Sequence, residues 1–150
     1  MSSSELDRLQ KAFREAGEKW STFVIWAKNS FTLGRSDYQR QYEPILYGWK
    51  EGTTHHWCGA RNEGDVWFVN KPFRNELHPT QKPVEVVQRA IRNSSQRGDI
   101  ILDPFAGSGT TMLACERTGR HARLLELDPA YADVIVNRYE QFTGMLAQRG

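Results

Sequence analysis

The stretch from Asp99 to Thr111, DIILDPFAGSGTT, contains the pattern that decides the fold. Residues 99–102 are mostly apolar and of strand length, and they lead into a short loop that holds Gly107 and Gly109. The residues that follow are typical of a helix, which Gly119 would end. A strand, a glycine loop and a helix in this order begin a βαβ unit, in which the glycines let backbone approach a ligand.

The flanking residues complete this unit. Residues 122–127 are predicted to form the second strand, and Asp128-Pro129 is a typical cap and first turn of a final helix. Upstream, Pro83 stands at a predicted helix start, followed by an apolar face that contains Val84, Val87 and Ile91. The alternation predicts an α/β fold of Rossmann-like type, with a mostly parallel sheet, flanking helices and a ligand site at the carboxyl ends of the strands.

The N-terminal part is predicted to contain one helix and three strands. Ser4 to Asp7 is similar to a capping box, and apolar residues then recur at helical spacing up to Gly17. Residues 22–27, TFVIWA, are β-branched or aromatic almost throughout, which predicts a strand buried on both faces. We expect a loop over 29–37. Two further strands are expected at the following ranges: 45–49 and 66–69.

The aromatic residues of this part are interpreted as structural. We expect Trp26, Trp49 and Trp67 to pack in the core rather than to stack on nucleobases. His55 and His56 are expected to be exposed loop residues.

The bulk properties leave a broad choice of function. A length of 150 residues is enough for one domain with its own core, and a net charge of +2 permits a nucleic-acid partner without requiring one. Cys58 and Cys115 stand far apart, which argues against a disulfide framework or a metal site. Because no signal peptide or membrane-length apolar segment is recognisable, we expect a cytoplasmic protein with no membrane association.

The glycine loop is compatible with three ligand classes, two of which fit poorly. A phosphate-binding loop would carry a lysine after its last glycine, where this chain has Thr110. A dinucleotide fingerprint would need a small residue in place of Met112. The third class is a nucleoside without phosphates, because Glu126 follows the glycines at about the twenty-residue distance typical of an acid that binds ribose hydroxyls. Asp103 could face a cationic part of the same ligand, although both acids could instead be helix caps or solvated loop residues.

Several segments resemble the DNA N6-adenine/N4-cytosine amino-methyltransferases. Residues 103–111, DPFAGSGTT, are similar to the cofactor motif of that family, and residues 126–131, ELDPAY, to its next acidic motif. Residues 78–83, HPTQKP, are similar to the segment that precedes the cofactor motif in the permuted β-group order. The resemblance continues through the family's middle strands and loops at residues 25–29, 35–38 and 42–45, and so covers nearly the whole chain.

The resemblance implies a partial methyltransferase fold that binds S-adenosyl-L-methionine. Glu126 would bind the ribose hydroxyls, and Thr80 and Lys82 would bind the methionine carboxylate, since a hydroxyl and a lysine suit an anion. Lys82 could also be an ordinary surface lysine, and the loop at 35–38 either faces DNA or is tied by Asp37. The full set of implied cofactor residues is Thr80, Lys82, Asp103, Phe105, Gly107, Ser108, Gly109, Thr110 and Glu126.

The catalytic motif of this family is not identifiable. It consists of Asp, Asn or Ser followed by Pro-Pro and an aromatic residue, and no Pro-Pro pair occurs in the 150 residues. In such enzymes the target base is flipped out and stacked on the aromatic ring, and the preceding groups hold its amino hydrogens. We therefore assign no catalytic residue. In the permuted order this motif and its strand would precede Met1, which would leave an exposed sheet edge.

Two functions of different classes are compatible with these observations. The first is a DNA methyltransferase acting on the exocyclic amino group of adenine, which we favour, or of cytosine, represented here by its C-terminal, cofactor-binding portion. Its partners would be double-stranded DNA and either a second copy or a complementary N-terminal chain, in a bacterial or phage restriction-modification context. The second is an inactive remnant that binds cofactor, DNA or protein. In either case we expect one methyltransferase domain, complete or incomplete, with a helix and middle strands at 1–49, an irregular target-recognition region at 50–77 and a cofactor-binding part at 78–150.

Overall fold

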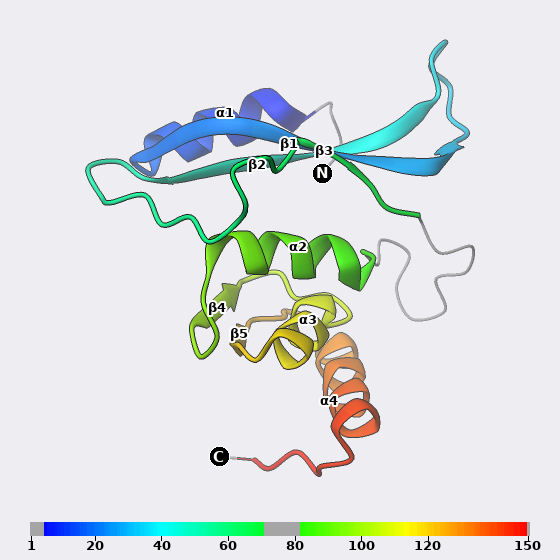
Figure 1. The fold of residues 1–150 in the computed structure, drawn as a ribbon. Helices are drawn as coiled ribbons and strands as arrows, with labels where there is room; N and C mark the ends of the chain where they lie inside the picture. The colour runs from blue at the N-terminus through cyan, green and yellow to red at the C-terminus, as the bar shows by residue number, and fades with distance from the viewer. Residues whose placement is uncertain (1–4, 71–81, 150) are drawn as a thin grey trace. The chain divides into compact units, whose positions relative to one another are not determined.

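The computed structural model describes residues 5–70 and 82–149 of the chain. Contacts divide these residues into two compact units, each with its own sheet (Figure 1). Residues 5–56 and 60–70 form the N-terminal unit, and residues 57–59 and 82–149 form the C-terminal unit.

The N-terminal unit consists of one helix and a three-stranded sheet. Helix α1 spans Leu6–Glu15, as predicted, and it contacts the first strand. The strands are β1 (Glu18–Thr32), β2 (Arg40–Lys50) and β3 (Val66–Phe68), in the order β2-β1-β3. Strand β1 pairs with β2 antiparallel and with β3 parallel. The three predicted strands therefore belong to one sheet, with the predicted segment 22–27 at its centre.

Strand β1 is longer and less buried than the sequence predicts. It continues to Thr32, so the predicted loop at 29–37 begins only after that residue. The reason is its pairing with β2, which also includes a salt bridge of 2.6 Å between Lys28 and Glu43. Among residues 22–27, Trp26 alone is buried, at 2% exposure, and its indole donates to the Val69 carbonyl at 2.7 Å. The expectation of burial on both faces is thus wrong for the other five side chains, which are half-buried.

The aromatic predictions hold for two of the three tryptophans. Trp26 and Trp67 are buried, whereas Trp49 is half-buried and stacks on His55, with 4.0 Å between the ring centroids. His55 and His56 are exposed, as expected. Trp49 therefore belongs to a surface cluster that also includes Tyr47, whose hydroxyl lies 2.8 Å from His55 Nε2.

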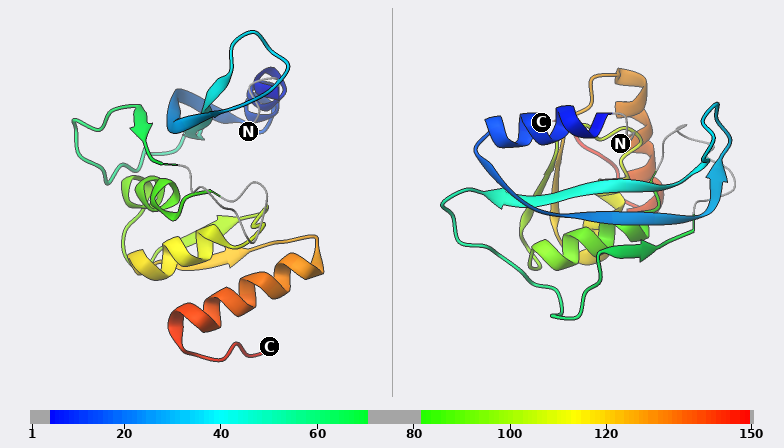
Figure 2. Two further views of the ribbon diagram at one scale, coloured as in Figure 1. Left: turned by 90° about the vertical axis from the view of Figure 1, so that its right-hand side faces the viewer. Right: turned by 90° about the horizontal axis from the view of Figure 1, so that it is seen from above.

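The C-terminal unit contains the predicted βαβ pattern and is shown in two further views in Figure 2. Its parallel strands are adjacent and pair Asp103 with Leu124 at their carboxyl ends. The elements in chain order are α2 (Val84–Ser94), β4 (Ile100–Asp103), α3 (Thr110–Thr118), β5 (His121–Leu124) and α4 (Pro129–Thr143). The α/β class is confirmed. Strand β5 ends three residues earlier than predicted because its partner β4 stops at Asp103 before Pro104, so Glu126 lies in the following loop.

A small apolar core positions these elements. Ile91 of α2 and the two α3 residues Ala114 and Cys115 are buried together. The apolar side chains packed against them are Val84, Val87, Ile101 and Ala122. This confirms the predicted apolar face of α2 and fixes α2 and α3 against one face of the β4–β5 pair. None of the helices in the described residues is long and apolar enough to cross a membrane.

The buried thiol of Cys115 gives a test of this core. Cys115 is 0% exposed, and burial, reinforced by the neighbouring Glu116, raises its pKa to about 11. At pH 8 the group is therefore both protonated and inaccessible, whereas Cys58 is exposed. We expect a thiol reagent such as DTNB to modify one cysteine of the folded chain, and none in Cys58→Ser until urea is added. Prompt reaction of folded Cys58→Ser would contradict this core.

Candidate functional site

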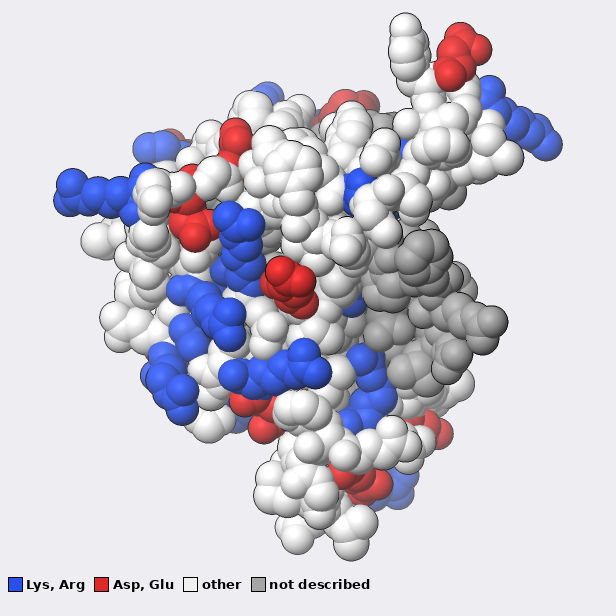
Figure 3. All heavy atoms as spheres, turned by 45° about the vertical axis from the view of Figure 1, so that its right-hand side comes forward, with Lys and Arg blue, Asp and Glu red and all other residues white. Residues whose placement is uncertain are grey.

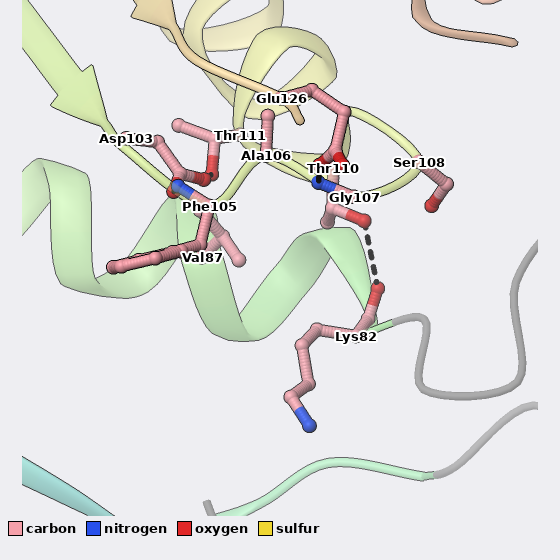
Figure 4. Close-up of a pocket in the computed structure, with 10 residues that line it drawn as sticks. All are labelled: Lys82, Val87, Asp103, Phe105, Ala106, Gly107, Ser108, Thr110, Thr111 and Glu126. Atoms are coloured by element: carbon pink, nitrogen blue, oxygen red, sulfur yellow. Dashed lines mark hydrogen bonds between the residues drawn. The ribbon is translucent and has the colours of Figure 1, made fainter. Parts of the chain in front are cut away.

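A cavity of about 430 Å³ lies beside the glycine loop of the C-terminal unit (Figure 4). This volume falls within the range of small-molecule sites. Its walls come from the start of α2, the end of β4, the loop and first turn of α3, and the loop after β5. The lining residues are Lys82, Val87, Asp103, Phe105, Ala106, Gly107, Ser108, Thr110, Thr111 and Glu126.

Seven of the nine predicted site residues line this cavity. Of the other two, Thr80 lies outside the described residues. Gly109 is in the loop but its position is fixed by packing: with φ of 77°, it lies against α4, and an added Cβ would come within 2.9 Å of Ile135 Cγ1. Its lack of a side chain thus serves the loop's conformation and its close approach to α4.

Asp103 ties the end of β4 to the glycine loop and to α3. Its Oδ1 accepts a hydrogen bond of 3.0 Å from the Phe105 N–H, and its Oδ2 accepts one of 2.6 Å from the Thr111 hydroxyl. Both hydrogen bonds are with groups where the loop and α3 begin, so Asp103 acts as a cap in addition to lining the cavity. A carboxylate has about four lone-pair sites, and two bonds leave acceptor capacity for a ligand.

Glu126 joins the loop after β5 to the glycine loop. Its Oε2 accepts a hydrogen bond of 2.6 Å from the Gly107 N–H, and its Oε1 accepts one of 3.0 Å from the Asp128 N–H. The side chain is half-buried at the cavity wall. The Gly107 N–H lies in the loop before α3, whose N-cap is Gly109, and this protein carboxylate satisfies it.

Lys82 contacts the loop through its backbone. Its carbonyl oxygen accepts a hydrogen bond of 3.4 Å from the Thr110 hydroxyl, drawn as the dashed line in Figure 4. The same view shows its side chain extending away from the glycine loop. Binding of a ligand carboxylate by the ammonium group therefore stays a prediction that needs this side chain to turn toward the cavity.

Phe105 gives the cavity an exposed apolar wall. It is 88% exposed and follows Pro104 in the exposed turn after β4. Exposure of a whole aromatic ring beside a cavity is typical of a ligand contact. Two carboxylates and this ring together suit a ligand that carries hydroxyl or cationic donors and an apolar ring.

Sequence reasoning missed three lining residues: Val87, Ala106 and Thr111. Val87 was predicted as core, and it also packs against the core. Thr111 is buried and holds Asp103. The sequence offers one signal for Thr111, the threonine pair directly after the second glycine. Thr111 is eight residues from Asp103, however, and the two residues meet only because the loop between them folds back.

The site can now be compared with known proteins. A family model described as DNA methylase, N6_N4_Mtase, matches residues 2–137 of this chain. The chain belongs to the DNA methylase family. The resemblance stated from the sequence motifs is therefore confirmed, and the cavity beside the glycine loop is a feature of a DNA methylase chain.

Two curated DNA methylases show how much of such a protein is present. Type II methyltransferase M.Cfr9I of Citrobacter freundii is 42% identical over 83 residues, which cover 55% of this chain and 27% of M.Cfr9I. Type II methyltransferase M.BglI of Bacillus subtilis is 30% identical over 149 residues, which cover 89% of this chain and 42% of M.BglI. The chain thus spans less than half the length of either relative.

A solved structure supports the same fold. The M1.HpyAVI–SAM complex superposes with a TM-score of 0.80 at 27% sequence identity, covering 91% of this chain and 70% of that chain. The predicted fold class, an α/β S-adenosylmethionine-dependent methyltransferase fold with flanking helices, is confirmed.

The contact between Thr111 and Asp103 can be tested by stability. Thr111→Val keeps the shape of the side chain but leaves Asp103 Oδ2 without its hydroxyl donor. Loss of such a buried partner costs about 1–3 kcal/mol. We expect the free energy of unfolding in urea to fall by about that amount. Thr111→Ser is the matched control, since it loses a methyl group and keeps the donor; a valine variant as stable as the serine variant would contradict the role of this bond.

Proposed function

We propose that the cavity binds S-adenosyl-L-methionine and that this chain is the cofactor-binding portion of a DNA amino-methyltransferase. The observation that carries the proposal is the hydrogen bond from the Gly107 N–H to Glu126. Together with Asp103 on the Phe105 N–H, it places two carboxylates on backbone amides of the glycine loop, and their negative charge disfavours a phosphate beside them. The loop is thus suited to a nucleoside ligand that carries no phosphate.

The parts of S-adenosyl-L-methionine match the groups in the cavity. Glu126 and Asp103 both line the cavity with carboxylates, which accept hydrogen bonds, so Glu126 suits the ribose hydroxyls and Asp103 a cationic group. Phe105 offers an apolar surface for an uncharged ring. Further support is that M1.HpyAVI, at 27% identity, was solved as a SAM complex.

The reaction proposed for the whole protein is methylation of an exocyclic amino group in double-stranded DNA. S-adenosyl-L-methionine supplies the methyl group: a nitrogen–carbon bond forms, the sulfur–carbon bond breaks and the amino group loses a proton. The 150 residues contain no Pro-Pro pair, so we propose that the groups holding the base come from other residues of the protein or from a complementary chain. Adenine is our first expectation for the target and cytosine the second.

The surface charge is compatible with DNA binding but does not by itself indicate it. Figure 3 shows Lys and Arg side chains interspersed with Asp and Glu on the face that is drawn. Binding to DNA phosphates relies on basic groups and is strongly salt-dependent. The DNA substrate is therefore proposed from the family, and an inactive binding module remains the second candidate.

A strand partner also belongs to this proposal. Among the described residues, β4 is paired with β5 along one edge. An unpaired edge presents backbone donors and acceptors to any further strand. We propose that the other edge of β4, the one that does not face β5, accepts a strand from the rest of the protein, from a complementary chain or from a second copy.

Cofactor binding is tested by calorimetric titration with S-adenosyl-L-methionine, with ATP and NAD as phosphate-containing controls. We expect the intact chain to bind S-adenosyl-L-methionine and Glu126→Ala to bind it about 10- to 100-fold more weakly, as for the loss of hydrogen bonds to a charged group. Glu116→Ala removes an exposed carboxylate of α3 that does not line the cavity, and should bind normally. Absence of binding by the intact chain, or a preference for ATP, would overturn the proposal.

Methyl transfer is tested separately on unmodified double-stranded DNA with radiolabelled S-adenosyl-L-methionine. We expect no transfer by these 150 residues alone, because the base-holding motif is absent from them. Transfer by the complete protein, followed by nucleoside analysis, would distinguish N6-methyladenine from N4-methylcytosine. Clear turnover by the 150 residues would refute the assignment of the base-holding groups to other residues, and no turnover by the complete protein would favour the inactive module.

A further inference from the structure

Helix α4 packs directly against the glycine loop with two residues one turn apart. Ile135 occupies the space next to Gly109, where it would meet an added Cβ within 2.9 Å. Arg138 follows three residues later on the same face. Its Nη1 donates to the backbone carbonyl of Ser108 and, at 3.2 Å, to the Ser108 hydroxyl. Ser108 itself is 4% exposed.

The environment of Arg138 is unusual for an arginine. The side chain is half-buried, and burial, with a smaller contribution from Arg117, lowers the pKa of its guanidinium. No carboxylate of the described residues forms a salt bridge with it, and both of its hydrogen-bond acceptors belong to Ser108. Burying a charge near another charge of the same sign costs free energy. Here two uncharged oxygens are the hydrogen-bond acceptors of the guanidinium. The two hydrogen bonds join α4 to the middle of the glycine loop.

The loop needs such an external tie because Ser108 stands between two glycines. Gly107 has φ of 53° and Gly109 has φ of 77°. Glycine reaches several backbone regions at similar energy, so the chain on either side of Ser108 has alternative conformations. Since the peptide group is planar, fixing the Ser108 carbonyl also fixes the direction of the Gly109 N–H. Glu126 holds the other side of Ser108 through the Gly107 N–H.

We propose that Arg138 is a positioning residue for the cofactor, acting through Ser108 to hold the segment from Gly107 to Gly109 in its binding conformation. This inference rests on the proposed function, since it concerns affinity for S-adenosyl-L-methionine. Arg138 does not line the cavity, so its effect on the ligand passes through the loop. A ligand that binds a loop already held in place loses less conformational entropy on binding.

The test compares three variants by calorimetry with S-adenosyl-L-methionine. Arg138→Met keeps the aliphatic packing but removes the Nη1 that donates both hydrogen bonds to Ser108, and we expect its Kd to rise about tenfold. Arg138→Lys retains a donor for the Ser108 carbonyl and should recover most of the affinity, which loss of packing alone would not explain. Arg117→Met is the matched control: it removes a neighbouring arginine that stacks on Phe142 of α4 and has no contact with Ser108, and its Kd should stay unchanged.

A second readout follows the loop itself by amide ¹H–¹⁵N NMR and hydrogen exchange without ligand. In Arg138→Met the Gly107, Ser108 and Gly109 amides should shift and exchange faster, while those of Gly98 and Gly144 stay in place. Unchanged affinity and unchanged loop amides in Arg138→Met would overturn the inference, even if the intact chain binds the cofactor. Failure of the intact chain to bind would overturn the proposed function instead. If Arg138→Met does not fold, Arg138→Leu provides the same test because it also lacks a donor to Ser108, and native loop amides in that variant would refute the tie.

Discussion

The hydrogen bond of 2.6 Å from the Gly107 N–H to Glu126 is the interaction on which the site depends. A loop that opens a helix exposes backbone N–H groups, which attract anions. Here the anion is part of the protein, and it comes from the loop after β5. The bond therefore closes the βαβ unit at its carboxyl end and sets the charge of the cavity. Because a carboxylate already accepts from this amide, its negative charge disfavours a phosphate beside it, and its place in the cavity wall suits a ligand with hydroxyl donors.

The glycine loop is held from three directions, each by a residue of a different element. Asp103 of β4 binds its first amide, Glu126 binds its middle, and Arg138 of α4 binds the Ser108 carbonyl. The small core around Ala114 and Cys115 positions the strands and α3, which carry these groups or face them. The conformational freedom that glycines bring is thus removed by long-range contacts. This is how a flexible sequence can form a preorganised binding loop.

The sequence predicted the elements of the C-terminal unit well because their signals are local. The apolar run before Asp103, the glycines after it and Asp128-Pro129 each specify structure within a few residues, and the Asp128 side chain does cap α4 at the Ala130 N–H. The extension of β1 to Thr32 was missed because it depends on pairing with β2, eight or more residues away. The bonds of Thr111 and Arg138 were missed for the same reason. The role of Lys82 was predicted from its motif, and the structure adds that its carbonyl accepts a hydrogen bond from Thr110 at the start of α3.

Two side chains next to the glycine loop show what the loop presents to a ligand and what holds it in place. Phe105 exposes an entire ring at 88%, and Arg138 places a half-buried charge on two neutral oxygens of Ser108. Each is unfavourable for folding by itself, since apolar exposure forgoes the hydrophobic gain and burial of a charge carries a desolvation penalty. On the proposed function, the ring of Phe105 contacts the cofactor and Arg138 holds the loop that binds it, so each side chain contributes to ligand binding rather than to folding.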